Sequence, residues 1–513
     1  MCGQTEVCST KKVSSDLAGC LRQIFEPQDW KGLHAQVGDF EDKRSRWFLQ
    51  PLLLIGIALH LDSAATVGER FENALELDRI VRPKQRRCGS TLAGYLSALA
   101  ALPMRVFGGV RAIFQHALRR ANIDSAQVGR WNAYGLDGTK QNLPRTDANE
   151  KGFGAVTKEP ALPQGLTVAA VALGERQIWD WECGDSKASE RELALKIIRR
   201  LPPESLAVQD AGFVGYEHVR GVIKAGRHVL LRVGANVRLW TEKVGNAEAH
   251  GSEVWLWPDD RRSEAPLRLR LIKITTWKKK KYKSKKRKGQ RRRRGHKLVR
   301  TTLWLLTDVL DEKKLTQEEA AEIYGRRWGG NEIRFRDWKC TLKAATLLSH
   351  TPKQARRERE LSLCAAMLLQ VLAARARKGR REPFRKMSMA NAARIWRKAV
   401  RRGGAKKSTR WFGKAMSAAV VDNYERKRPK VKRRWPQRKE HNMAGTPKFR
   451  KLTKDVKVLG LKRLDEKCAG RVYGIECHAP FRLGAAVCKS VRDCNLRLRI
   501  ISRIVCSRAR PFC

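Results

Sequence analysis

The chain has 513 residues, a length that suggests about three domains. Its 108 Lys and Arg residues outnumber 51 Asp and Glu residues, which gives a formal net charge of +57, and 42% of the residues are hydrophobic, enough to exclude wholesale disorder. The charge argues against an ordinary metabolic enzyme. It favours a polyanionic partner, most commonly nucleic acid, because a polyanion relieves the self-repulsion of so many cations.

The first region, residues 1–125, is predicted to be mainly helical. Apolar patterns predict helices over 52–61, 90–99 and 106–118. Basic residues cluster just before the last two of these helices: Arg82, Lys84, Arg86 and Arg87. We expect this region to bind DNA ends, although a helical packing or dimerisation domain fits the same pattern equally well.

The longest apolar runs, 51–61 and 92–104, are shorter than the ~20 residues that a helix needs to span a bilayer. The N-terminus lacks the order of a secretory signal, in which a basic stretch precedes an apolar stretch and a small-residue cleavage site. We therefore expect no membrane partner and a cytoplasmic protein associated with the nucleoid.

From about residue 131 strand and helix patterns alternate, which is typical of an α/β domain. Strands are predicted at 131–136, 166–173, 176–181, 206–209 and 228–233. Helices are predicted at 189–200 and 214–225.

A second pattern begins near residue 237 and predicts a β-rich insertion over 237–297. Apolar and polar residues alternate in part at 254–257 and 267–274, as in half-buried antiparallel strands. Residues 278–297 include 14 Lys or Arg in 20 positions and no acid, so we expect a flexible basic loop there.

The pattern of the C-terminal part begins with a strand predicted at 298–309. Thr316 and Glu319 form a capping-box pattern that opens a helix through Trp328, and further helices are predicted at 331–347 and 358–375. Residues 376–450 form a basic region that we expect to bind DNA, with a solvated tail as the alternative, and residues 451–513 form a tail of uncertain role.

Three acidic residues are notable in so basic a chain. Asp137 and Asp210 each follow a predicted buried strand directly. In open α/β sheets, sites form at the carboxyl ends of strands, where two carboxylates suit Mg²⁺ and substrate phosphates. Taken singly, each aspartate also fits a turn or cap, as the nearby Gly138 and Gly212 indicate.

The third acid, Glu332, is predicted to lie on a helix with two basic residues on the same face. Arg336 and Lys339 follow it at i+4 and i+7. An acid flanked by bases fits a site where the acid binds a metal and the bases bind DNA phosphate. Salt bridging on a solvated helix face is the alternative.

These motifs together resemble the Asp-Asp-Glu (DDE) transposases of bacterial insertion sequences, specifically the insertion-sequence-4 group. That family has an Asp-Gly-Thr/Ser turn, an Asp-x-Gly-Phe/Tyr turn and a Tyr-x2-Arg-x3-Glu-x6-Lys signature. The first two match Asp137-Gly138-Thr139 and Asp210-Ala211-Gly212-Phe213, and the third matches Tyr324, Arg327, Glu332 and Lys339. One departure is that four residues, not three, separate Arg327 from Glu332, and the Gly329–Gly330 pair is expected to absorb the extra residue by breaking or kinking the helix.

The resemblance implies a ribonuclease-H-like catalytic domain, here 126–236 and 298–375, interrupted by the β-rich insertion. It implies that Asp137, Asp210 and Glu332 are catalytic and hold two Mg²⁺ ions, or Mn²⁺, about 4 Å apart for phosphoryl transfer. The residues expected to contact DNA phosphates are Tyr324, Arg327, Arg336, Lys339 and, more weakly, Arg232.

The implied activity is cut-and-join transposition, with water and then a DNA 3′-hydroxyl as nucleophile. The expected partners are transposon ends and target DNA, and joining two ends calls for at least a dimer on DNA. A hydrolytic nuclease of the same fold and a catalytically decayed or otherwise non-enzymatic nucleic-acid-binding protein remain as alternatives.

Overall fold

The computed structural model describes residues 16–40, 45–121, 126–154, 162–242, 250–257, 264–283, 294–378, 387–402, 411–420 and 445–452. All of them belong to one compact unit, Met1–Thr453. The expectations for residues 122–125, 284–293, 421–444 and almost all of the predicted tail lie outside the described residues.

The N-terminal region is helical, as predicted. Its described helices are α1 (Leu17–Ile24), α2 (Pro27–Val37), α3 (Leu49–Leu61), α4 (Val67–Val81), α5 (Leu92–Ala101) and α6 (Arg105–Arg120). Helix α3 is apolar on nearly every side, and most of its residues are buried, so it forms the centre of this helical layer. Among the described helices, none alone has the length and apolar character to cross a membrane; α5 and α6 pass such a test only as a pair bent by 93°.

One member of the predicted basic cluster has a structural place. The Arg82 side chain is only 7% exposed and forms an ion pair with Asp78 on the preceding turn of the chain, at 2.5 Å. The charge of Arg82 is therefore paired inside the helical layer, and DNA binding by this region stays a prediction.

The central feature of the fold is one mixed sheet. Its strands are β1 (Gln127–Val128), β2 (Trp131–Asn142), β3 (Gln164–Ala172), β4 (Gln177–Gly184), β5 (Leu206–Gln209), β6 (His228–Val233), β7 (Arg238–Thr241), β8 (Ser252–Leu256), β9 (Leu267–Lys283), β10 (Arg294–Thr307) and β11 (Lys448–Lys451). The order is β11-β7-β8-β9-β10-β6-β5-β2-β3-β4, and β1 pairs with β2. Strands β2, β5 and β6 are parallel, whereas β3 and β4 run antiparallel in a meander. The fold is thus mixed α/β, as predicted.

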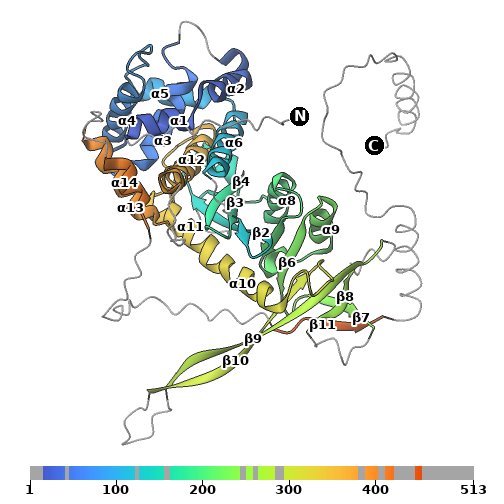
Figure 1. Cartoon of the computed structure of the whole chain (residues 1–513). Helices are drawn as coiled ribbons and strands as arrows, with labels where there is room; N and C mark the ends of the chain where they lie inside the picture. The colour runs from blue at the N-terminus through green and yellow to red at the C-terminus, as the bar shows by residue number, and fades with distance from the viewer. Residues whose placement is uncertain are drawn as a thin grey trace, which may run out of the picture. The chain divides into compact units, whose positions relative to one another are not determined.

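The two faces of the central strands are covered by different helices (Figure 1). On one face Ala133, Val208 and Leu230 form a hydrophobic cluster with α10 (Gln317–Arg327). On the other face Leu136 and Ala207 belong to the larger cluster that includes α8 (Glu190–Arg200) and α9 (Tyr216–Lys224). Because side chains alternate along a strand, the residue number decides which helix a side chain meets.

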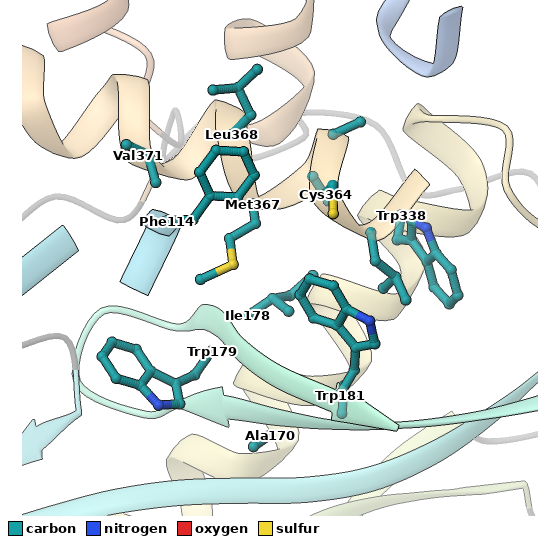
Figure 2. Packing of buried hydrophobic residues seen from close by; sticks show 14 of the residues in the cluster. Phe114, Ala170, Ile178, Trp179, Trp181, Trp338, Cys364, Met367, Leu368 and Val371 are labelled. Carbon is teal, nitrogen blue, oxygen red and sulfur yellow. The ribbon is translucent and has the colours of Figure 1, made fainter. Parts of the chain in front are cut away.

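Helix α12 (Pro352–Arg377) joins the sheet to the N-terminal helices. Its side chains Cys364, Met367 and Leu368 lie over the aromatic residues of β4, with Phe114 of α6 beside them (Figure 2). The Trp181 indole donates a hydrogen bond to Glu360 at 2.7 Å. The remaining described helices are α7 (Asp147–Phe153), α13 (Met389–Arg401) and α14 (Trp411–Ser417).

The predicted basic loop is partly strand. Strands β9 and β10 pair antiparallel, from Arg270 opposite Thr307 to Lys283 opposite Arg294. Both ends of the 278–297 segment therefore belong to a hydrogen-bonded two-stranded ribbon. The prediction of a flexible loop is wrong for 278–283 and 294–297, because cross-strand hydrogen bonds extend a hairpin beyond the point where apolar alternation stops. Strand β11, at the end of the predicted basic region 376–450, pairs in parallel with β7.

The helix predicted at 331–347 is replaced by a mixed segment. A π-helical turn spans Trp328–Glu332, α11 covers only Ile333–Arg336, and a second π-helical turn spans Asp337–Thr341. A π-helical turn accommodates one extra residue without breaking the helix. The residue added between Arg327 and Glu332 is therefore absorbed by a wider turn, and Gly329 and Gly330 lie inside it.

Candidate active site

Asp137 and Asp210 lie at the same level of two neighbouring parallel strands. Gly135 of β2 is level with Val208 of β5, so two residues further along each strand come to Asp137 and Asp210. Asp137 is four residues beyond Ala133, and Asp210 is two residues beyond Val208. Because side chains alternate along a strand, both aspartates lie on the same face as these two residues, the face covered by α10.

The prediction that β2 ends at Asp137 is wrong, although Asp137 does lie at the edge of the sheet region where the pairing of β2 with β5 ends. Strand β2 continues to Asn142, paired with β3. What ends after Gly135 is the pairing with β5, so Asp137 lies beside an open strand edge. Asp210 directly follows β5, as predicted, and its Oδ1 accepts a hydrogen bond from Gly212 N at 2.9 Å.

Arg327, the last residue of α10, lies between the two aspartates. Its Nη2 is 3.3 Å from Asp137 Oδ2 and 3.5 Å from Asp210 Oδ2, and its side chain is only 5% exposed. No hydrogen-bond partner for Arg327 Nε is present among the described residues. Arg327 thus contacts the carboxylates, whereas the sequence predicts a contact with phosphate.

The electrostatics of Asp137 show that one guanidinium does not balance the acids around it. Burial raises the pKa of Asp137 to about 6, against the lowering effect of Arg327. The charges of Asp210 and Glu332 raise the Asp137 pKa further. Asp137, Asp210 and Glu332 are therefore close enough to interact, and the cluster has an excess of negative charge.

Tyr324 and Arg232 line the same face. Tyr324 lies one turn before Arg327 on α10, and Arg232 has the same parity on β6 as the buried Leu230 of the α10 cluster. Burial raises the pKa of Tyr324, while the positive charges of Arg327 and Arg232 lower it. The structure therefore brings both predicted residues next to the aspartates.

Glu332 occupies a different position from the one expected on a regular helix. It is exposed at the end of the π-helical turn, whereas its neighbour Asn331 is buried and donates a hydrogen bond from Nδ2 to Gly135 O at 2.9 Å. A Cβ atom on Gly135 would overlap Asn331 Oδ1, so this glycine permits the close approach. Asn331 stands at the spacing from Arg327 that the Tyr-x2-Arg-x3-Glu signature gives to the acid.

The two predicted basic residues after Glu332 are separated by the structure. Lys339 Nζ donates a hydrogen bond to Lys140 O of β2 at 2.6 Å, and burial lowers the pKa of Lys339. Arg336 is exposed and forms an ion pair with its neighbour Asp337 at 4.0 Å. Lys339 is thus held on the strand that carries Asp137, while the placement of Arg336 gives it no contact with the acids.

Glu190 is a residue of this cluster that the sequence analysis missed. It begins α8, and its carboxylate lies against Gly138, next to Asp137. Burial raises the pKa of Glu190, and the charges of Asp137 and Asp210 raise it further. From the sequence, Glu190 is predicted only to be an acid in the first turn of a helix, and it belongs to no recognisable motif.

The donor chemistry of the cluster fits a divalent cation. All candidate ligands are carboxylates, which Mg²⁺ prefers, and their total negative charge exceeds the single positive charge of Arg327. As the side chains stand, the described residues include no group of three His, Cys, Asp or Glu arranged to enclose a metal ion. The guanidinium of Arg327 occupies the position between Asp137 and Asp210.

The chain was compared with known proteins in three ways. No curated protein sequence matches the chain. Among solved structures, the chain is similar to the cryo-EM structure of a piggyBac transposase synaptic complex with hairpin DNA, at 11% identity and a TM-score of 0.38 over 82% of this chain and 88% of that chain. Residues 136–368 match the model of the family described as "Transposase DDE domain". The matched segment contains all the predicted site residues, and it is this part of the chain that is similar to the transposase DDE domain.

Proposed function

We propose that the chain is a DNA transposase of the DDE type that cleaves and joins DNA strands by phosphoryl transfer. The observation that carries the proposal is the level placement of Asp137 and Asp210 beside Arg327, inside the segment similar to the transposase DDE domain. The strand order β4-β3-β2-β5-β6 with α8 and α10 on opposite faces supports a ribonuclease-H-like catalytic domain. Assignment to the insertion-sequence-4 group rests on the Tyr-Arg-Glu-Lys signature.

The proposed roles follow from position. Asp137, Asp210 and Glu332 would hold two Mg²⁺ ions, with Mn²⁺ as a substitute; when bound, such ions activate a nucleophile and stabilise the leaving oxygen. Arg327 pairs with both aspartates and orients them toward one point. Tyr324, Arg232 and Lys339 line the approach for a DNA phosphate, and Arg336 contributes an exposed charge further out.

DNA is the proposed partner, both as transposon ends and as target. The basic ribbon of β9 and β10 and the region 376–450 would supply affinity that does not depend on sequence, through release of counterions from the DNA. The N-terminal helices would then select the DNA ends. We also propose a dimer on DNA and a cytoplasmic, nucleoid-associated location, on the grounds of the two-ended reaction and the charge.

The proposal is tested with purified full-length protein, Mg²⁺ and duplexes made from the DNA that flanks its own gene. We expect nicked ends, then strand-transfer products, and loss of both with chelator or with Asp137→Ala or Asp210→Ala. Cleavage without joining would instead identify a hydrolytic nuclease. Cleavage that survives either substitution would show that the acids are wrongly assigned.

A catalytically decayed transposase is the second candidate, and one observation favours it. The extra residue before Glu332 leaves that acid exposed and presents Asn331 to β2. Binding of the flanking DNA with no cleavage in Mg²⁺ or Mn²⁺ would establish this alternative.

A further inference from the structure

Glu190 rests directly on the strand residue that follows Asp137. A Cβ atom built on Gly138 would overlap the Glu190 carboxylate, and it would lie 3.1 Å from the Cγ atom of Glu190. Any side chain at Gly138 would therefore push Glu190 away. The glycine of the Asp137-Gly138-Thr139 motif thus has a local reason: it lets a carboxylate from α8 approach the strand.

The N-terminus of α8 also contacts the turn that carries Asp210. Arg191, the next residue, donates a hydrogen bond from Nε to Gly212 O at 3.0 Å. The Gly212 amide in turn binds the Asp210 carboxylate. One helix end therefore touches both aspartate-bearing segments, Glu190 at β2 and Arg191 beyond β5, and its position is fixed relative to both acids.

The charges at this point are unequal. The carboxylate of Glu190 lies against Gly138 and is affected by the charges of Asp137 and Asp210, and Arg327 forms ion pairs with the two aspartates. Arg327 is nineteen-twentieths buried, yet its Nε has no hydrogen-bond partner among the described residues. The excess of carboxylates points to a bound cation, whereas the unpartnered donor of Arg327 points to an acceptor such as water or a phosphate oxygen.

We propose that Glu190 is a fourth carboxylate ligand for the divalent cations of this site, beside Asp137, Asp210 and Glu332. The inference rests on the proposed function, because it adds a ligand to the same site. Two divalent cations bring four positive charges, which four carboxylates match. Glu190 supplies its charge from a helix fixed to both aspartate segments, whereas Glu332 supplies its charge from an exposed turn.

A simpler role for Glu190 is to stabilise α8. A carboxylate in the first turn interacts favourably with the helix dipole. Glu192 lies in the same first turn, is exposed, and forms no contact with Gly138 or the aspartates in the described structure, so it has the dipole role without the site role. Glu190→Gln and Glu192→Gln are therefore a matched pair that removes one charge from the same helix end.

The experiment is calorimetric titration of Mn²⁺ alone into the full-length protein without DNA. We expect Glu190→Gln to weaken Mn²⁺ binding about tenfold or more, the scale on which partners of a metal site act. Glu192→Gln should remain within twofold of the wild type. A Glu190→Gln protein that binds Mn²⁺ within twofold of the wild type would overturn the inference.

Two further variants keep the test decisive. Glu190→Asp retains the charge on a shorter side chain, so its Mn²⁺ affinity should fall between those of wild type and Glu190→Gln. If the Glu190→Gln protein does not fold, Glu190→Asp is tested in its place. Asp137→Asn should also weaken binding. Unchanged binding in Asp137→Asn would refute the metal site of the proposed function itself, whereas weakened binding there with unchanged binding in Glu190→Gln would refute only the role of Glu190.

Discussion

Two groups of carboxylates lie on the same sheet, and their charges are balanced to different degrees. Asp180 of β4 is 2% exposed and pairs with two guanidiniums, Arg111 at 3.0 Å and Arg200 at 2.9 Å. Its Oδ1 also accepts a hydrogen bond from Trp181 N at 2.7 Å. At the other group, Asp137 and Asp210 share Arg327 at longer distances of 3.3 and 3.5 Å.

The difference separates a structural acid from a candidate catalytic one. At β4 Arg111 and Arg200 pair with Asp180, and Arg200 also pairs with Glu182. Acids and bases are equal in number there, so the charges are satisfied within the protein and the cluster joins α6 and α8 to the sheet. At β2 and β5 several carboxylates surround one cation, so the cluster is stabilised by any further cation that binds there. Asp180 is buried, whereas Asp137 and Asp210 are only partly buried, and the ratio of acids to bases also differs between the two groups.

The largest expected effect is on catalysis. Asp210→Asn should reduce DNA cleavage in Mg²⁺ by about 10³-fold, because it removes several kcal/mol of charge stabilisation from the transition state. Thermal unfolding should show an intact fold. Cleavage within tenfold of the wild type would remove the distinction between the two groups.

The same substitution on β4 should damage the fold instead. Asp180→Asn leaves the buried side of Arg111 without its carboxylate, whereas Arg200 keeps its ion pair with Glu182. We expect a loss of about 3 kcal/mol in the free energy of unfolding. The cleavage rate of the folded fraction should stay within a few-fold of the wild type. A normal unfolding free energy would mean that water solvates these guanidiniums and that the ion pairs contribute little.

The pH dependence of stability provides a third test. The pKa of Asp137 is raised to about 6 in the folded state, so folding favours its protonated form. Without divalent cations, this residue should make the protein less stable as the pH rises from about 4 through 6, by about 2 kcal/mol in total. The measurement is the difference in unfolding free energy between wild type and Asp137→Asn across this range. A difference that does not change with pH would contradict the burial of Asp137, which is the main cause of its raised pKa, and saturating Mn²⁺ should abolish the change.

The smallest effect is expected from replacing the cations. Arg327→Lys keeps one charge but loses the planar fork that reaches both aspartates, which should cost about 1 kcal/mol of stability in chelator. Mn²⁺ should restore most of this loss. The matched variant Arg111→Lys should be destabilised to a similar degree but should not be rescued by Mn²⁺, and equal rescue of both would show that Mn²⁺ acts elsewhere.

Much of the fold follows from local patterns. Apolar runs predicted the strands β3, β5 and β6, and helical apolar patterns predicted α3, α5, α6 and α12. Such runs, and caps such as Thr316 with Glu319, act over a few residues. The level placement of Asp137 and Asp210 was predicted for the same reason. The domain boundaries and the roles of the site residues stay predictions.

What the tertiary structure alone decided are the features that depend on contacts between distant residues. Strand β2 passes beyond Asp137 because β3 pairs with it, and β9 and β10 extend into basic sequence because each provides hydrogen bonds for the other. Arg327 was expected to bind phosphate and instead contacts two aspartates, and Glu190 carried no motif at all. The sequence determined which residues are charged and which strands they follow, whereas only packing determined how many acids surround each base, since that ratio depends on which elements meet in space.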